Sequence, residues 1–129
     1  GSACSFEWAT SGVEKRPPDQ EGLLVATNHF VDPSWDFTPP GVDAPDVDFS
    51  VQRRVNLLAL AEENMGDFDP QVMMEAISTP LEDGGAFRAP NLTSYEIVAV
   101  PAELTVWVRV PEYQDWVEID LGRYFSWRE

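Results

Sequence analysis

The sequence predicts an α+β fold in which an antiparallel sheet carries a pair of helices on one face. The prediction comes from the order of the segments, because two strand-like segments are followed by two helical ones and then by three more strand-like ones. Strands and helices that are segregated in this way are typical of α+β layers. The chain has 129 residues, 43% of them hydrophobic, which is enough to form the core of a single domain over residues 1–129.

The first strands are predicted near the N-terminus. Residues 3–10, ACSFEWAT, combine aromatic and small side chains as strands do. Residues 14–22, EKRPPDQEG, are polar, and we expect them to connect a hairpin. Residues 23–30, LLVATNHF, are apolar on both faces, which favours a strand covered on both sides. Because side chains alternate along a strand, one of these faces carries Leu24, Ala26, Asn28 and Phe30.

A loop and then the first helix are predicted next. Residues 32–49 contain four prolines interleaved with aspartates, Trp35 and Phe37. Proline cannot supply a ladder hydrogen bond, so we expect an irregular, ordered lid or pocket wall. Residues 50–66 repeat apolar side chains at helical spacing, with Ser50 as the N-cap and Gly66 at the end.

The remaining elements follow clear boundary signals. A second helix is expected after Asp69, the predicted N-cap, and Pro80 should end it. Three strands are then predicted in segments rich in β-branched and aromatic residues, which are SYEIVAV at 94–100, ELTVWVRV at 103–110 and DWVEIDL at 115–121.

The charge balance restricts the partners. Eight Lys and Arg against 23 Asp and Glu give a net charge of −15, so nucleic acid and anionic membrane surfaces are not expected partners. No apolar run approaches the roughly 20 residues that cross a bilayer, and no signal peptide is expected in this sequence, since no basic segment followed by an apolar one opens it. Residues 1–2 look like a tag remnant. A single cysteine excludes an internal disulfide and a multi-cysteine metal site.

Asn28 and His29 are the first candidate functional residues. A buried amide without partners costs roughly 1–3 kcal/mol, so Asn28 either bonds neighbouring backbone or presents its NH2 group to a ligand, where it could stabilise an oxyanion. No second histidine or cysteine stands at ligand spacing, so His29 is expected to be a structural or pocket-lining ring and no metal is expected. Cys4 could act as a thiol nucleophile with His29 as base, but a small buried hydrophobe is the favoured interpretation.

Arg53 and Arg54 are the second candidate group. They fall in the first turn of the predicted helix, where the macrodipole disfavours positive charge. We expect an acidic partner near Asp46 and Asp48, or an acidic ligand. Salt-bridged surface arginines are the simpler alternative, although adjacent helical positions differ by about 100°, so one of the two must face inward or along the edge.

Together these segments resemble the linear-amide C–N hydrolases of the N-terminal-nucleophile (Ntn) superfamily, which include choloylglycine hydrolases, penicillin acylases and the C45 acyltransferase-like peptidases. The resemblance rests on SFEWAT, GLLVATNHF, the S-x-x-R pattern from Ser50 to Arg53, GGAF, TSYEIVAVPAELTVWVRVP and WVEIDLGRYF. It covers nearly the whole chain but only the C-terminal portion of the family's catalytic domain.

The resemblance implies an αββα sandwich and a cysteine nucleophile that attacks an amide carbonyl to give an acyl-thioester. By likeness Asn28 stabilises the oxyanion and Arg53, or Arg54 in a different register, supports the site. The pocket wall would include His29, Phe30, Trp35 and Phe37. No cofactor is implied, and the partner of the full-length protein is a small amide substrate.

The sequence departs from the family in lacking its nucleophile segment, since Cys4 lies within a strand. We therefore expect a C-terminal fragment that has no amidase activity alone and that associates, for example as a homodimer, through an exposed apolar sheet face. The alternative function is a non-catalytic acidic domain that binds a ligand or a partner.

Overall fold

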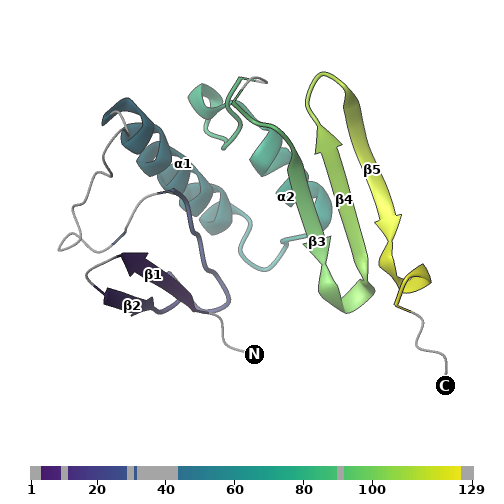
Figure 1. Cartoon of the computed structure of the whole chain (residues 1–129), viewed down its shortest axis with the longest axis horizontal. Helices are drawn as coiled ribbons and strands as arrows, with labels where there is room; N and C mark the ends of the chain where they lie inside the picture. The colour runs from purple at the N-terminus through teal and green to yellow at the C-terminus, as the bar shows by residue number, and fades with distance from the viewer. Residues whose placement is uncertain (1–3, 10–11, 29–30, 32–43, 90–91, 126–129) are drawn as a thin grey trace.

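The computed structural model describes residues 4–9, 12–28, 31, 44–89 and 92–125. Within these ranges the chain forms a two-stranded and a three-stranded antiparallel sheet with two helices between them along the chain (Figure 1). The predicted α+β class and the order of strands, helices and strands are therefore confirmed. Among the helices described here, none has the length and apolarity of a membrane span.

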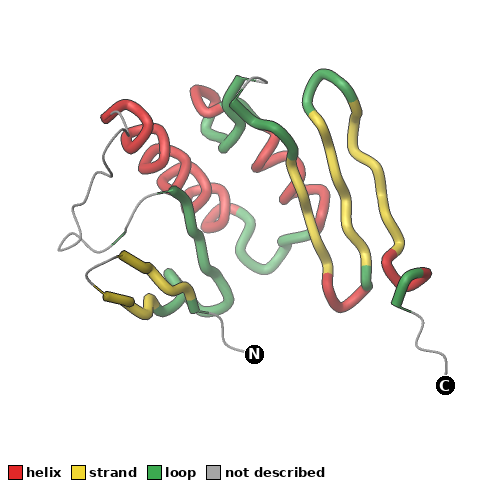
Figure 2. The backbone as a smooth tube through the Cα atoms, viewed as in Figure 1, coloured by secondary structure: helices red, strands yellow, loops and turns green. Residues whose placement is uncertain are grey.

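The N-terminal hairpin differs from the predicted one. β1 (Ser5–Ala9) pairs with β2 (Gly12–Arg16), so residues that were predicted to be a turn form the second strand. Residues 23–28, predicted as a strand, form a loop apart from an isolated bridge between Leu23 and Gln20 (Figure 2). The reason is that side chains take the polar groups a ladder would need: the Val25 amide donates to Asp19 Oδ2 at 2.8 Å, and the Val25 carbonyl accepts from Arg16 Nη2 at 2.7 Å.

Helix α1 (Ala44–Glu63) begins well before the predicted start. Pro45 stands in its first turn, where a missing amide hydrogen costs nothing, so this proline is compatible with a helix that the loop prediction excluded. Ser50 is consequently not an N-cap but a fully buried residue in the helix interior. Arg53 and Arg54 lie mid-helix, so the expected conflict with the macrodipole at a first turn was wrong. Residues 32–43 of the predicted loop lie outside the described residues.

Helix α2 (Pro70–Ser78) has the predicted boundaries. Asp69 is its N-cap and accepts from the Val72 amide at 2.8 Å, and Pro80 follows its end. The chain then turns tightly through η2 (Leu81–Asp83), and a Cβ on Gly85 would lie 2.0 Å from the Thr79 carbonyl oxygen. Only glycine permits that approach.

Asn56 ties α1 to this turn. Its buried side-chain NH2 donates to the carbonyl oxygens of Leu81, at 3.0 Å, and of Gly85, at 2.8 Å. The Leu81 carbonyl also accepts from the Gly84 amide, at 3.3 Å, within the tight turn. Through these two bonds one side chain joins α1 to the turn that follows α2.

The C-terminal sheet confirms the three predicted strands. β3 (Glu96–Val100), β4 (Thr105–Val110) and β5 (Gln114–Asp120) form an antiparallel meander in that order. Helix α2 packs against β3, on the face where Glu96 and Val98 are buried. Of the predicted helix pair, α2 is the helix that packs on this sheet.

The opposite face of this sheet is apolar and partly exposed. Register places Ile97 across from Val108 and then Val117, and it places Ala99 across from Val106 and then Ile119. We call these six residues the open sheet face. Ile97 is 51% and Val117 40% exposed.

Candidate functional site

Asn28 and Arg53, which the resemblance assigned to the same site, lie in direct contact. Arg53 Nη2 donates a hydrogen bond of 2.7 Å to Asn28 Oδ1. A guanidinium can only donate, so the amide oxygen must face Arg53 and the Nδ2 donor group must point elsewhere. Asn28 is exposed rather than buried, contrary to the prediction, because its segment is a loop on α1 and not a strand inside a layer.

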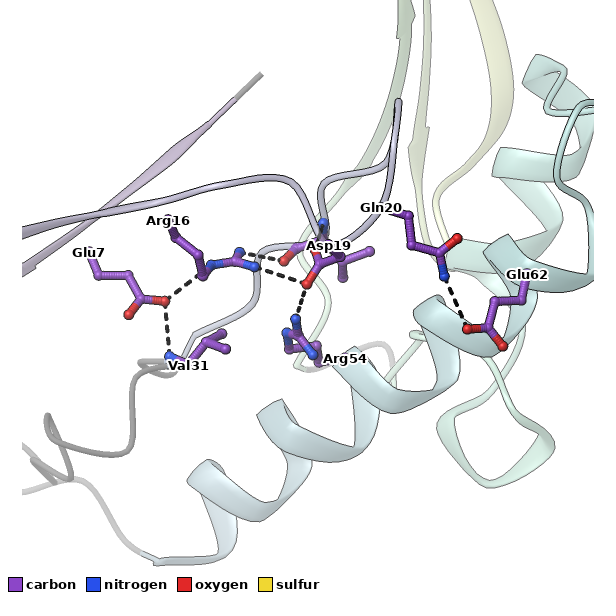
Figure 3. Close-up of polar contacts among 8 residues, drawn as sticks. Glu7, Arg16, Asp19, Gln20, Val31, Arg54 and Glu62 are labelled. Carbon is purple, nitrogen blue, oxygen red and sulfur yellow. Dashed lines mark hydrogen bonds and ion pairs between the residues drawn. The ribbon is translucent and has the colours of Figure 1, made fainter. Parts of the chain in front are cut away.

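The loop that carries Asn28 is held by a cluster of four charged side chains from three elements (Figure 3). We call them the Asp19 cluster, and they are Glu7, Arg16, Asp19 and Arg54. Asp19 Oδ1 accepts from Arg16 Nη1 at 3.1 Å and from Arg54 Nη2, and Arg16 Nε lies 3.4 Å from Glu7 Oε1. All four side chains are largely shielded from water, so this network joins the hairpin, the loop and α1 into one unit.

Two further hydrogen bonds fix the ends of the loop. The Val31 amide donates to Glu7 Oε1 at 2.9 Å, and Gln20 Nε2 donates to Glu62 Oε1 at 3.1 Å near the end of α1 (Figure 3). Asn28 is therefore placed between Val25 and Val31, both of which bond to the cluster through their backbone. The site is positioned by ionic side chains rather than by a β-ladder.

The adjacent arginines of α1 have different partners. Arg54 turns to Asp19, whereas Arg53 turns to Asn28. Side chains next to each other on a helix point about 100° apart, so both cannot reach the same group. We expected an acidic partner for the arginines near Asp46 and Asp48. The partner of Arg54 is instead Asp19, which comes from the loop.

The Asp19 cluster predicts an acid-sensitive stability. Burial acts to raise the pKa of Asp19, but the Val25 amide and the guanidinium groups of Arg54 and Arg16 outweigh it and hold this pKa below its usual value. Because the pKa of Asp19 is lower in the folded protein than in the unfolded chain, ionised Asp19 stabilises the fold. This stabilisation is fully present above about pH 4, the pKa of an unfolded aspartate. It is lost as the pH falls through the pKa of Asp19 in the folded protein. We expect Asp19→Asn to lower stability by about 1–3 kcal/mol at pH 7, because it weakens charged hydrogen bonds.

This difference should shrink below about pH 4, as wild-type Asp19 itself becomes protonated. Thermal unfolding of both proteins between pH 7 and pH 3 measures it, with Asp67→Asn as the control, since it removes the same charge from an exposed residue. A gap between wild type and Asp19→Asn that is constant over this range would show that the Asp19 charge contributes nothing.

The environment of Arg53 is electropositive. Its Nε is buried and has no hydrogen-bond partner within the described part of the chain. Burial and then the neighbouring charge of Arg88 lower the pKa of Arg53, which nevertheless stays protonated at physiological pH because guanidinium is so basic. The guanidinium of Arg88 lies over the ring of Phe49, with Cζ 4.1 Å from the ring centroid.

The structure says less about the other predicted site residues. The pocket residues lie outside the described residues, and they are His29, Phe30, Trp35 and Phe37. Cys4 is half-buried just before β1, and the Cys4–His29 pairing is outside what the structure describes. Over the described ranges no three His, Cys, Asp or Glu side chains gather as metal ligands would.

Comparison of the chain with protein-family models, with curated proteins and with solved structures found no match. The chemistry of the site is therefore argued from Asn28, Arg53 and their surroundings.

Proposed function

We propose that this chain is the C-terminal part of an Ntn-type hydrolase or acyltransferase that acts on linear amides. The supporting observation is the 2.7 Å hydrogen bond from Arg53 to Asn28 Oδ1. It leaves the amide donor of an exposed side chain pointing away from its only described partner, as an oxyanion-stabilising residue requires.

The guanidinium contributes in two ways. It fixes the rotation of the carboxamide, so no reorganisation is needed when a negative charge develops on the substrate oxygen. It also withdraws electron density through the amide oxygen, which makes the Nδ2 hydrogens better donors because hydrogen bonds in a chain polarise one another.

In the proposed reaction, the thiolate of a cysteine from a preceding segment adds to the amide carbonyl, and Asn28 donates to the resulting oxyanion. The nucleophile's α-amine takes the proton of the thiol as the thiolate forms. Collapse of the intermediate then breaks the C–N bond, the leaving amine takes this proton from the α-ammonium group, and an acyl-thioester remains. Water or a second amine then releases the acyl group and regenerates the thiol.

The test is to express the longer reading frame that includes this chain and to supply fluorogenic linear amides of different acyl groups. We expect amine release together with an acyl-thioester that hydroxylamine cleaves and that intact-mass spectrometry detects on a cysteine outside residues 1–129. Hydrolysis without any acyl-enzyme, or acylation at Cys4, would contradict the proposal.

The proposal includes the αββα architecture. A second sheet laid on the open sheet face would cover Ile97 and Val117, as sheets pack about 10 Å apart in such sandwiches. Without that cover the face is expected to drive association of the chain, as a dimer or larger assembly in light scattering. A monodisperse monomer would speak against a missing second layer.

A non-catalytic interaction domain is the second candidate, and the N-terminal hairpin favours it. Phe6, Trp8 and Val13 lie on the same face of this hairpin, since Trp8 pairs with Val13, and all three are exposed. Such aromatic faces are typical of recognition surfaces. Loss of partner binding in Trp8→Ala, with no acyl-enzyme in the longer protein, would decide for this candidate.

A further inference from the structure

The segment that carries Asn28 is a loop, and a catalytic side chain on a loop needs support from its surroundings. A donor to an oxyanion has to be held within about 0.5 Å of its working position, and loops hold side chains less precisely than helices or strands do. Here the Val25 side chain is buried, its amide donates to Asp19 and its carbonyl accepts from Arg16. Because these contacts are made by charged side chains, the placement of Asn28 depends on the Asp19 cluster.

Asp19 contacts both the loop and α1. Its Oδ2 accepts from the Val25 amide at 2.8 Å, and its Oδ1 accepts from Arg54 Nη2 (Figure 3). Arg53, the preceding residue of α1, donates to Asn28 Oδ1 at 2.7 Å. Consecutive arginines of one helix therefore hold two points of the same segment, and the contact between Asp19 and Arg54 fixes how far the loop lies from Arg53.

The Asp19 cluster is also an unusual way to stabilise a loop. Its two carboxylates and two guanidinium groups balance in charge, and all four are largely shielded from water. Moving such groups out of water costs several kcal/mol per ion, and apolar side chains of similar volume often stabilise a fold equally well. Charged hydrogen bonds differ from apolar contacts in their defined direction and length. That property is useful where one arrangement of a loop has to be selected.

We propose that Asp19 is a positioning residue for the oxyanion donor. Through its two contacts it keeps the loop at the distance from α1 at which the Asn28 carboxamide meets Arg53. The inference rests on the proposed function and deepens it, because it names the residue on which the alignment of the donor depends. Both arginines of α1 then serve one donor, Arg53 directly and Arg54 through Asp19.

Asp19→Asn in the chain as it is tests whether Asp19 holds Asn28. Asparagine keeps one oxygen for the Val25 amide, but it turns an NH2 group toward two guanidinium groups that can only donate, so the contact with α1 is lost. In ¹⁵N relaxation at pH 7, we expect the backbone order parameter of Asn28 to fall from about 0.85 to below about 0.6. Its side-chain NH2 signals should move to their positions in Arg53→Met, the variant that removes the hydrogen bond to Asn28 directly.

Arg54→Met is the second variant, because it breaks the same contact from the side of the helix. Asp19 keeps its bonds to Arg16 and to the loop, so this variant should remain folded even if Asp19→Asn does not. We expect the same loss of order at Asn28. Asp67→Asn, which removes an exposed carboxylate, is the matched control and should change nothing there. An Asn28 that is already mobile in the wild type, or that stays ordered in Arg54→Met, would overturn the proposal.

A double-mutant cycle in the longer protein tests the effect on the reaction. Asp19→Asn should lower kcat by about tenfold to a hundredfold with KM nearly unchanged, as expected for a catalytic group that is out of place. In an Asn28→Ala background the same substitution should lower kcat by less than about twofold, because the donor that Asp19 positions is absent. An equal loss in both backgrounds would mean that Asp19 supports the fold in general, and it would overturn the positioning role.

Failure of this inference and failure of the proposed function give different results. A longer protein without any acyl-enzyme would contradict the proposed function, whereas the order of Asn28 in the chain would still decide whether Asp19 holds it. A longer protein that forms the acyl-enzyme at the same rate with and without the Asp19 carboxylate would remove the positioning role and leave the proposed function standing.

Discussion

Asn28→Ala, made in the longer protein that the proposed function requires, is expected to lower kcat for amide cleavage by about 10²–10³-fold, the usual effect of removing one oxyanion donor. KM should change little, because the donor is needed most when the carbonyl oxygen becomes negative. The cost in stability should be small, since Asn28 is exposed and its one described hydrogen bond is to the half-buried Arg53 of α1. Steady-state kinetics together with a thermal melt measure both quantities.

Asn28→Asp is the sharper variant of the same test. Aspartate keeps the oxygen that accepts from Arg53, but it has no N–H donor and adds a negative charge beside the developing oxyanion. We expect a melting temperature at or above that of wild type and a kcat as low as that of Asn28→Ala. Asn64→Ala, just after the C-terminal end of α1, is the control for loss of an amide. If Asn28→Asp kept activity within tenfold of wild type, Asn28 would not be the oxyanion donor.

Arg109→Met should cause the largest loss of stability in the C-terminal sheet. Glu96 is buried, at 6% exposure, and its Oε2 accepts from Arg109 Nη1 at 2.8 Å and from Ser78 Oγ at 3.2 Å. Its Oε1 is buried with no hydrogen-bond partner in the described chain, so the arginine provides most of the compensation for burying this carboxylate. Because Arg109 is itself partly solvated, we expect a loss of about 2–4 kcal/mol, somewhat below the value for a fully buried pair.

Urea unfolding of the chain measures this loss against two comparison proteins. The Arg123–Asp120 pair is exposed, so Arg123→Met should cost no more than about 0.5 kcal/mol. The double variant Arg109→Met with Glu96→Leu should recover much of the lost stability, because it removes the orphaned charge and leaves an apolar pair in register between β3 and β4. Equal losses in Arg109→Met and Arg123→Met would mean that Glu96 is compensated by other groups.

The elements that were predicted well have local causes. β3, β4 and β5 are specified by β-branched and aromatic residues between turn signals, and α2 by a capping aspartate and a proline in its first position. These signals act over a few residues, so the sequence displays them directly.

The predictions that failed depend on distant partners. Residues 23–28 have the composition of a strand, but Asp19 and Arg16 take the backbone groups of Val25, and Arg54 fixes Asp19 from α1. Adjacent polar residues in EKRPPDQEG gave no indication that two of them form a shielded ionic network. The one sequence feature that pointed to this network was the pair Arg53 and Arg54, for which an acidic partner was expected. It did not indicate that this partner is Asp19.

The candidate site likewise depends on contacts between residues that are distant in the sequence. Nothing in the spacing of Asn28 and Arg53 predicts their contact, and the family resemblance placed both in one site without predicting the hydrogen bond between them. The residues that position Asn28 were missed, because charged side chains in a turn normally remain in solvent.

The long reach of the Asp19 cluster has a kinetic consequence. The Arg54–Asp19 contact spans 35 residues and the Val31–Glu7 contact spans 24, so each requires a large loop to close before it contributes anything. The meander of β3, β4 and β5 joins neighbours in sequence and can assemble early. In a refolding experiment, native sheet should therefore be detected before the amide of Asn28 becomes ordered, and Asn28 should be among the first groups released when the protein begins to open.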